Sequence, residues 1–281
     1  MQVQIRILVE NTSNMPGVWG EYGFAALITT PDARILFDTG SEGTIFNNAA
    51  FLGEDLKSIK NIVISHGHFD HTGGIIPLLK QNPDRRIHIH PHAFAIRKVQ
   101  TIEGNVRDIG SKFMERDVKS FGSQIVWVND FTELCPHLFI TGEIPRTNDF
   151  EEAGSYLGKK FQVIRGSETL DDNIEDDMAI VINHSRGLII VSGCAHAGII
   201  NTIEYARKKT GKSQILAFIG GTHLMTVSED RLEKTINYLK DSQIETLILS
   251  HCTGFHAAAR MYDALGDKVM LGTAGTYLEF K

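Results

Sequence analysis

The stretch SHGHFDHTGG, residues 65–74, constrains this chain more than any other, because it places three histidines and an aspartate within six residues. It follows the β-branched run NIVIS and precedes the apolar run GGIIPLLKQN, a pattern that predicts a loop between a buried strand and a helix. Ligand sites of α/β sheets lie at the carboxyl ends of their strands. We therefore expect His66, His68, Asp70 and His71 to lie at such an edge.

The spacing of these four residues suits two neighbouring metal ions. Residues two apart on an extended loop point the same way, so His66 and His68 can hold one ion together, while Asp70 and His71 turn toward a second. Neutral imidazole and carboxylate are ligands of zinc, iron or manganese. The alternative is that the histidines cap a helix or satisfy backbone groups; four candidate ligands so close together favour the metal.

Three strands expected in the second half of the chain each end in a candidate ligand. LIIVSG leads to Cys194 and His196, ILAFIGG leads to His223, and ETLILS leads to His251 and Cys252. Strands alternate with helices in two successive sets, which predicts a layered α/β domain with two sheets inside and helices outside. The candidate ligands of both halves are then expected to converge on one edge.

Residues 1–281 are expected to form a single domain, because no linker divides the chain. The polar stretch 142–177 carries scattered aromatic residues and is expected to be a cap over the site. Residues 92–100, HAFAIRKVQ, are expected to begin a helix. The acidic run 168–177 is expected to be a solvated face, with Asp176 or Asp177 able to reach the rim of the site.

Composition excludes several classes of protein. The net charge is −6 and no run of Lys and Arg is sustained, so the electrostatic footprint of a nucleic-acid-binding protein is missing. The N-terminal residues lack the features of a signal peptide, and no apolar stretch approaches the roughly 20 residues that span a bilayer. Cys135, Cys194 and Cys252 are odd in number and widely spaced, which argues against a disulfide framework. We expect a cytoplasmic protein with reduced thiols that acts on a small molecule.

SHGHFDHTGG resembles the H-x-H-x-D-H signature of the metallo-beta-lactamase fold superfamily, and LFDTG is similar to its upstream aspartate turn. GEIPR, SGCAHAGIIN, GGTHL and SHCTG are similar to segments of the branch labelled 7,8-dihydropterin-6-methyl-4-(beta-D-ribofuranosyl)aminobenzene-5'-phosphate synthase-like. The resemblance runs over essentially the whole chain. It implies the α/β, four-layer αββα sandwich of that superfamily.

The resemblance also implies a role for each matching residue. The implied metal ligands are His66, His68 and His196 at a first position and Asp70, His71 and His251 at a second. Asp38 would orient the opening loop through hydrogen bonds. The metals implied are two zinc ions, with iron or manganese as alternatives.

The chain departs from the superfamily where hydrolases carry a bridging aspartate after a later strand. Cys194 stands at that place, either as a thiolate ligand or as a small buried residue beside the site. Asp70 and His223 are the expected catalytic residues. His223 is expected to face the cleft as an acid/base or substrate-contacting group, with a structural role as the alternative. Arg146 is expected to pair with an anionic substrate, or with Glu143.

Three functions follow from these residues. The leading hypothesis is an enzyme, a metal-dependent hydrolase in which metal-bound hydroxide attacks an ester, phosphodiester or lactone-type centre. The second is a metal-dependent transferase or synthase for a pterin- or phosphate-bearing substrate, which the branch label implies. The third is an iron-containing redox protein, because a thiol in place of the bridging carboxylate favours softer metals.

Overall fold

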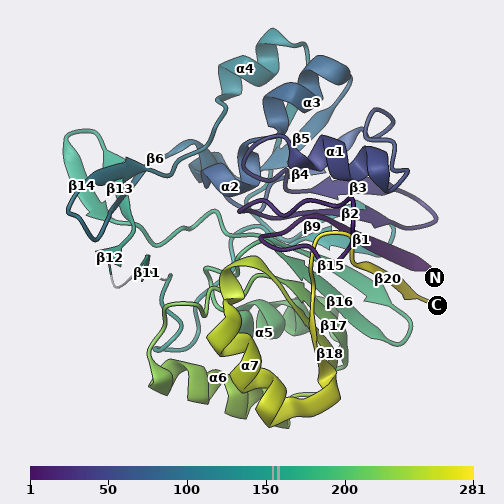
Figure 1. Ribbon diagram of the computed structural model, residues 1–281, viewed down its shortest axis with the longest axis vertical. Coiled ribbons are helices and arrows are strands. Elements are labelled where there is room, and N and C mark those ends of the chain that lie inside the picture. The colour runs from purple at the N-terminus through teal and green to yellow at the C-terminus, as the bar shows by residue number, and fades with distance from the viewer. Residues whose placement is uncertain (154, 157–158) are drawn as a thin grey trace.

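The computed structural model describes residues 1–153, 155–156 and 159–281. Two seven-stranded sheets lie face to face, and helices cover the outer side of each sheet (Figure 1). The predicted four-layer αββα sandwich is confirmed. In the described ranges, no helix combines the length and the apolar character needed to cross a membrane.

The first sheet comes from the N-terminal half of the chain, with the last strand added at its edge. In spatial order its strands are β20 (Tyr277–Phe280), β1 (Val3–Val9), β2 (Ala25–Thr29), β3 (Arg34–Phe37), β4 (Asn61–Val63), β5 (Arg86–Ile89) and β8 (Gln124–Trp127). The expected hairpin is present, since β2 and β3 pair antiparallel, whereas β3, β4, β5 and β8 run parallel. Its outer helices are α1 (Thr44–Phe51), α3 (Ile75–Gln81) and α4 (Glu115–Ser120).

The second sheet comes from the C-terminal half. In spatial order its strands are β19 (Val269–Leu271), β18 (Ile244–Leu249), β17 (Ile215–Gly220), β16 (Gly187–Ser192), β15 (Ala179–His184), β10 (Leu138–Ile140) and β9 (Thr132–Cys135). The strands β16 to β19 are parallel, and every residue of β16 and β17 is buried because both faces are covered. Its outer elements are α5 (Ile199–Thr210), α6 (Glu229–Asp241), α7 (Phe255–Leu265) and the 3₁₀ helix η3 (Gly266–Lys268).

The two sheets are held together by an apolar layer between them. Ile5 and Phe37 of the first sheet and Ile180 and Ile219 of the second are fully buried in this layer. Burying one such side chain contributes about 1.5–3 kcal/mol. The packing fixes the two sheets against each other, so that the loops at their shared edge keep a constant separation.

A smaller sheet projects from the sandwich beside that edge (Figure 1). Its strands, in spatial order, are β14 (Glu168–Asp171), β13 (Gln162–Arg165), β6 (Ile96–Gln100) and β7 (Val106–Asp108), with the pair β11 (Ser155–Tyr156) and β12 (Lys159–Lys160) next to it. Residues 142–177 supply four of these strands. That they act as a cap stays a prediction, and positions 154 and 157–158 of this stretch lie outside the described residues.

The expectation of a helix beginning within residues 92–100 is wrong. The chain forms the 3₁₀ turn η1 (Pro91–Phe94) and then β6, which pairs with β7 and β13. Arg97 and Val99 are buried while their neighbours are more exposed, an alternation with the period of a strand. Pairing with two strands distant in sequence therefore overrides the local signal.

Candidate metal centre

The metal ligands expected from the sequence come together at one edge of the sandwich, beyond the C-terminal ends of β4, β16 and β18. The groups whose ligand atoms lie within 4.8 Å of one another are the first trio (His66, His68, His196), the second trio (Asp70, His71, His251), and two mixed groups, His66–His71–Cys194 and Cys194–His251–Cys252. All of these side chains are buried. Because the groups share members, they form one continuous cluster.

The opening loop presents His66 and His68 between β4 and the short helix α2 (Phe69–Thr72). His66 Nε2 and His68 Nδ1 lie 2.9 Å apart. Gly67 between them is required by close packing, since a Cβ there would lie 1.9 Å from the carbonyl oxygen of Ala93. Glycine at this position thus lets the loop pack against Ala93 in the conformation in which the two imidazoles converge.

Hydrogen bonds orient the rings of the first trio. His66 Nδ1 lies 2.9 Å from Ser65 Oγ, and His196 Nδ1 lies 2.8 Å from the carbonyl oxygen of Ala153. The carbonyl can only accept, so His196 carries its proton on Nδ1 and presents a lone pair at Nε2. Among the described residues, His196 Nε2 is buried with no hydrogen-bond partner. A buried, unpartnered lone pair is costly unless a cation takes it up, so this atom fits a metal ligand.

The second trio is oriented in the same way by side chains rather than by backbone. His71 Nδ1 lies 2.7 Å from Asp38 Oδ2, and His251 Nδ1 lies 2.9 Å from Asn11 Oδ1. Both partners accept, which leaves Nε2 of each ring free to bind a metal. His251 Nε2 has no hydrogen-bond partner in the described part of the chain and lies 3.3 Å from Asp70 Oδ2.

Asp38 and Glu10 tie these ligands to the first sheet. Asp38 accepts hydrogen bonds from both the backbone N–H and the hydroxyl of Ser65, each at 2.7 Å, as well as facing His71. Glu10, at the end of β1, accepts from the backbone N–H of His251 at 2.7 Å. The sequence predicts Asp38 through the LFDTG turn, but Glu10 and its neighbour Asn11 carry no motif that points to the site.

The two trios differ in protonation. Burial, with the neighbouring imidazoles, lowers the pKa of both His66 and His196 well below the usual value. Burial also lowers the pKa of His68 to about 3. Burial opposes the charge of His71 as well, but Asp38 and Asp70 outweigh it and raise the pKa of His71 to about 9. At neutral pH the first trio is therefore uncharged, and His71 carries a proton that a metal must displace.

Asp70 completes the second trio as its anion. Burial alone would raise the pKa of this carboxyl group, but His71 and His251 hold it below its usual range. The carboxylate thus stays ionised at neutral pH. It is the one anionic ligand in the second trio.

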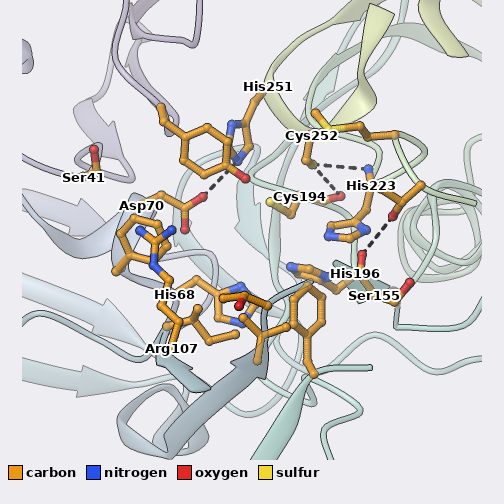
Figure 2. A pocket seen from close by; sticks show the side chains of 18 of the residues that line it. Ser41, His68, Asp70, Arg107, Ser155, Cys194, His196, His223, His251 and Cys252 are labelled. Carbon is orange, nitrogen blue, oxygen red and sulfur yellow. Dashed lines mark hydrogen bonds and ion pairs between the residues drawn. The ribbon is translucent and has the colours of Figure 1, made fainter. Parts of the chain in front are cut away.

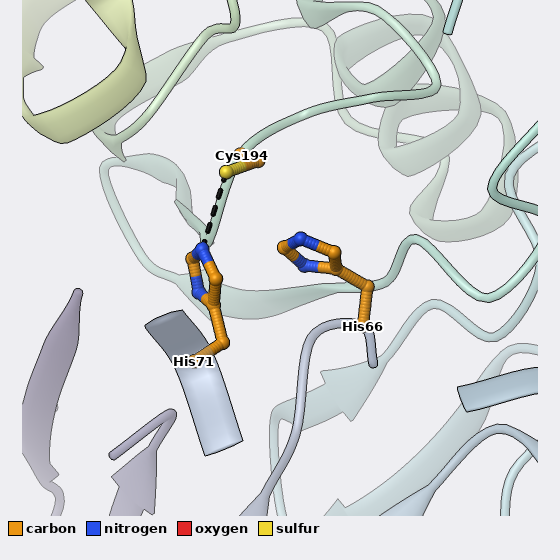
Figure 3. A group of neighbouring side chains, drawn as sticks. All are labelled: His66, His71 and Cys194. Atoms are coloured by element: carbon orange, nitrogen blue, oxygen red, sulfur yellow. Dashed lines mark hydrogen bonds between the residues drawn. The ribbon is translucent and has the colours of Figure 1, made fainter. Parts of the chain in front are cut away.

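Two thiols lie between the trios. Cys194 Sγ is 3.2 Å from His71 Nε2, and the ring of His66 lies next to that of His71, with ring centres 4.3 Å apart (Figure 3). Burial raises the pKa of the Cys194 thiol well above its usual value. Cys252, which follows His251 at the end of a predicted strand, accepts a hydrogen bond from the backbone N–H of His223 at 3.3 Å. Its signal in the sequence is its place directly after His251 in SHCTG.

An acidic pair, Asp176 and Asp177, supports the first trio from outside. Asp176 accepts from the backbone N–H of Gly67 at 2.7 Å, and Asp177 accepts from that of Ala197 at 2.8 Å. Each carboxylate thus holds one of the two loops that carry the first trio. The side chain of Arg97 pairs with Asp176 and supplies the charge that burial demands.

The expectation that residues 168–177 form a solvated face is therefore wrong for their buried members. Asp172, Asp176 and Asp177 are all buried. Asp172 lies 2.6 Å from Nε of Arg97, which bridges it to Asp176. The expectation that Asp176 or Asp177 reaches the site points to part of this cluster, but Arg97 was not expected there, because it lies on β6 in the stretch expected to begin a helix.

A cavity of about 640 Å³ opens beside the metal ligands. Figure 2 shows His68, Asp70 and Arg107 along one wall and His196, His223 and Cys252 along the opposite wall. Aromatic lining comes from Tyr22, Phe69 and Phe161. The size and the mixed lining suit a small organic molecule.

The mouth of the cavity is basic on one side. The guanidinium of Arg107 lies 4.9 Å from the ring centre of Phe69, and the ammonium of Lys112 lies 5.6 Å from the same centre. Both cations are exposed and line the cavity. Stacking on the ring positions both charges where an anionic group of a ligand would enter.

His223 and Arg146 occupy different surroundings. His223 lines the cavity with its ring centre 4.3 Å from that of His196, and burial lowers its pKa to about 4. Arg146 is not among the lining residues; its guanidinium donates to the carbonyl oxygens of Asn173 and of His196, the latter at 3.3 Å. A substrate-binding role for Arg146 stays a prediction.

Strained backbone is concentrated at this edge. Among the described residues, four of the six non-glycine residues with positive φ are Asp38 (59°), Ala195 (53°), His223 (50°) and His251 (50°). Such conformations cost of order 1–3 kcal/mol each and persist where the surrounding contacts impose them. Of these four residues, Asp38 contacts His71, His223 lines the cavity and His251 is a member of the second trio.

The arrangement was compared with known proteins. A model described as the Metallo-beta-lactamase superfamily matches residues 18–155. The chain is 32% identical over 272 residues to a 7,8-dihydropterin-6-methyl-4-(beta-D-ribofuranosyl)-aminobenzene-5'-phosphate synthase of Methanocaldococcus jannaschii, covering 93% of this chain and 91% of that protein.

Solved structures are similar over the same extent. Tm1679, a metal-dependent hydrolase of the beta-lactamase superfamily, matches with a TM-score of 0.83 and 27% identity over 99% of each chain. Zn(2+)-bound PqqB from Methylobacterium extorquens has the same fold, with a TM-score of 0.58 and 13% identity over 98% of this chain and 99% of that chain. The similarity therefore includes both sheets and all the loops that carry the candidate ligands.

Proposed function

The chain belongs to the metallo-beta-lactamase superfamily, and from this membership and the site we propose that it is a metal-dependent synthase that joins two small molecules, at least one of which bears a phosphate. The observation that carries the proposal is the placing of both trios in one cluster beside a cavity whose mouth presents two exposed cations. These are Arg107 and Lys112, and the same cavity is also lined by Glu42 and Glu103.

The residues fit one or two divalent metal ions. The first trio would hold one ion, and the second trio would hold another. The unpartnered Nε2 atom of His196 supports this assignment, because its lone pair is already set to act as an acceptor. A bound metal supplies Lewis acidity toward an oxygen of the substrate, which eases the departure of a phosphate or diphosphate group.

The chain itself supplies positioning and proton transfer. Arg107 and Lys112 bind the phosphate at the mouth, and Phe69 and Phe161 pack against flat rings inside the cavity. When an amine attacks carbon, the new carbon–nitrogen bond forms as the carbon–oxygen bond to diphosphate breaks. The amine proton passes to His223, whose imidazole is neutral at neutral pH because burial lowers its pKa to about 4.

Two observations support a synthase ahead of a hydrolase. The relative that carries a synthase name is 32% identical over nearly the whole chain. In addition, Cys194 occupies the position where the superfamily's hydrolases carry a bridging carboxylate, and burial raises the pKa of its thiol. In the absence of a metal, Cys194 therefore does not place a negative charge between the two trios, as a bridging carboxylate would.

Product analysis tests the synthase proposal. Metal-loaded protein is incubated with a dihydropterin methyl diphosphate and a ribofuranosylaminobenzene 5'-phosphate, and the products are identified by mass spectrometry. We expect a coupled product and one released diphosphate per coupling. Release of the hydroxymethylpterin without coupling would overturn the synthase proposal in favour of hydrolysis. Metal-free protein and the variant His68→Ala serve as controls without activity.

Hydrolysis is the second candidate. The similarity to Tm1679, a metal-dependent hydrolase, extends over 99% of both chains at 27% identity, and the two trios are a donor set that suits hydrolysis equally well. A panel of phosphodiesters, carboxylic esters and lactones tests it. Turnover of one class, abolished by His68→Ala, would support a hydrolase.

A further inference from the structure

We propose that Cys194 and Cys252 are a thiol pair that, together with His251, binds the second metal through sulfur and so makes this position selective for a thiophilic ion such as zinc, cadmium or iron. The ligand atoms of these three residues lie within 4.8 Å of one another, and all three side chains are buried. The inference rests on the metal dependence within the proposed function, and not on the reaction catalysed.

The fold brings the two sulfur atoms together from separate strands. Cys194 follows β16, and Cys252 lies in the 3₁₀ turn η2 (His251–Thr253) that follows β18. The intervening strand β17 ends beside Gly221, where a Cβ would lie 2.6 Å from Cys252 Sγ. Only a glycine at the end of the middle strand leaves room for the two thiols to approach across it.

Local contacts suit Cys252 to the thiolate form that a metal requires. The backbone N–H of His223 donates to Cys252 Sγ at 3.3 Å, and a hydrogen bond donated to sulfur stabilises its anion. The second sulfur is Cys194, which faces His71 Nε2 at 3.2 Å. Figure 2 shows both cysteines at the cavity with His251 above them. A metal bound by this thiol pair would therefore remain accessible from the cavity.

A structural role for Cys252 makes a different prediction. In that case the thiol would donate to the carbonyl oxygen of Cys194, 3.6 Å away, and accept from His223, with no metal involved. A serine can do both. The substitution Cys252→Ser therefore keeps the hydrogen bonds and removes only the soft ligand, since sulfur selects zinc, copper(I) or iron whereas oxygen ligands suit magnesium, calcium and manganese.

Cobalt(II) spectroscopy tests the proposal on the intact chain. Reduced, metal-stripped protein is titrated with Co²⁺, and thiolate-to-metal charge transfer is followed in the near ultraviolet. We expect a band in the wild type, a loss of about half its intensity in Cys252→Ser and in Cys194→Ser, and no band in the double variant. Cys135→Ser, which alters the half-buried cysteine on β9 outside the cluster, should keep the full band.

Each of the other outcomes contradicts either the thiol-pair inference or the proposed function. A full band in Cys252→Ser, or no band in a wild type that binds cobalt, would overturn the thiol-pair inference alone. Protein that binds no divalent metal by elemental analysis would overturn the proposed function as well. If the serine variants do not fold by circular dichroism, the ¹¹³Cd chemical shift of the wild type decides: a two-sulfur shift supports the proposal, and a shift with one sulfur or none overturns it.

Discussion

The first trio and the second trio lie side by side in one cluster, yet they are built on different principles. The first trio is made of imidazoles alone, all uncharged at neutral pH because burial lowers their pKa values. The second trio combines an ionised carboxylate, a protonated imidazole and, through His251, the thiol pair. The first is ready to accept a metal as it stands, whereas the second must lose at least one proton.

Their supports differ as well. The loops of the first trio are held through backbone N–H groups by the acidic pair, which belongs to the chain next to β15. The rings of the second trio are held by the side chains of Asp38 and Asn11, which belong to the first sheet. Asp38 acts on both trios, because it also holds Ser65, whose hydroxyl lies 2.9 Å from His66 Nδ1. Asn11 and the acidic pair each support one trio alone.

The largest effect is expected from His68→Ala. Removing a ligand of the first trio should weaken metal binding there by more than about 100-fold, because loss of an outer partner alone typically costs 10- to 100-fold. The fold should persist, since the substitution removes a loop side chain and leaves the core intact. Calorimetric metal titration with circular dichroism as the folding control measures both. Unchanged metal content and activity would contradict the assignment of the first trio.

Asn11→Ala should act mainly on the second trio. The variant leaves His251 Nδ1 without its acceptor, so affinity at the second position should fall by about 10- to 100-fold. Asp177→Asn is the matched control, because an amide oxygen there still accepts from Ala197 and the second position should be unaffected. Equal losses in both variants would show that the two trios do not have independent supports.

The pH dependence of metal binding should separate the two positions. His71 has a pKa of about 9 before metal binds, so below that pH a metal must displace its proton, and affinity at the second position should rise about tenfold for each pH unit between 6 and 8. Any thiol that deprotonates adds to this slope. The pKa of His68 is about 3, so affinity at the first position should be flat over the same range. Titrations in buffers of different ionisation enthalpy count the released protons, and two identical slopes would contradict the contrast.

The smallest effect is expected at the mouth of the cavity. Arg107→Gln removes an exposed cation that contacts no metal ligand, so inorganic phosphate should bind the metal-loaded protein about 2- to 5-fold more weakly, as for other exposed ion pairs. Metal affinity at both positions should not change. Competition between phosphate and a chromogenic substrate measures the first quantity, and a change in metal stoichiometry would show that Arg107 acts on the centre itself.

The sequence predicts the sandwich and the convergence of both trios well, because each ligand follows a strand whose apolar pattern is clear. The ligands His196 and His251 could be found in this way although they are far from His66 in the chain. What the sequence does not reveal are the groups that support them: Asn11, Arg97 as the partner of the acidic pair, and Cys252 as a partner of Cys194. These contacts join segments that are distant in sequence, through loops and through β6, which was expected to begin a helix. No local spacing of residues predicts such contacts.

The hydrogen bonds from Glu10 and Asn11 to His251 join residues about 240 positions apart, and this separation gives the centre an order of assembly. A ribosome extends a chain by about 5–20 residues per second, so His196 emerges several seconds before His251. During that interval Glu10 and Asn11 have been made but still lack their partner. All three members of the first trio are therefore made before the second trio is complete, because the second has Asp70 and His71 but still lacks His251.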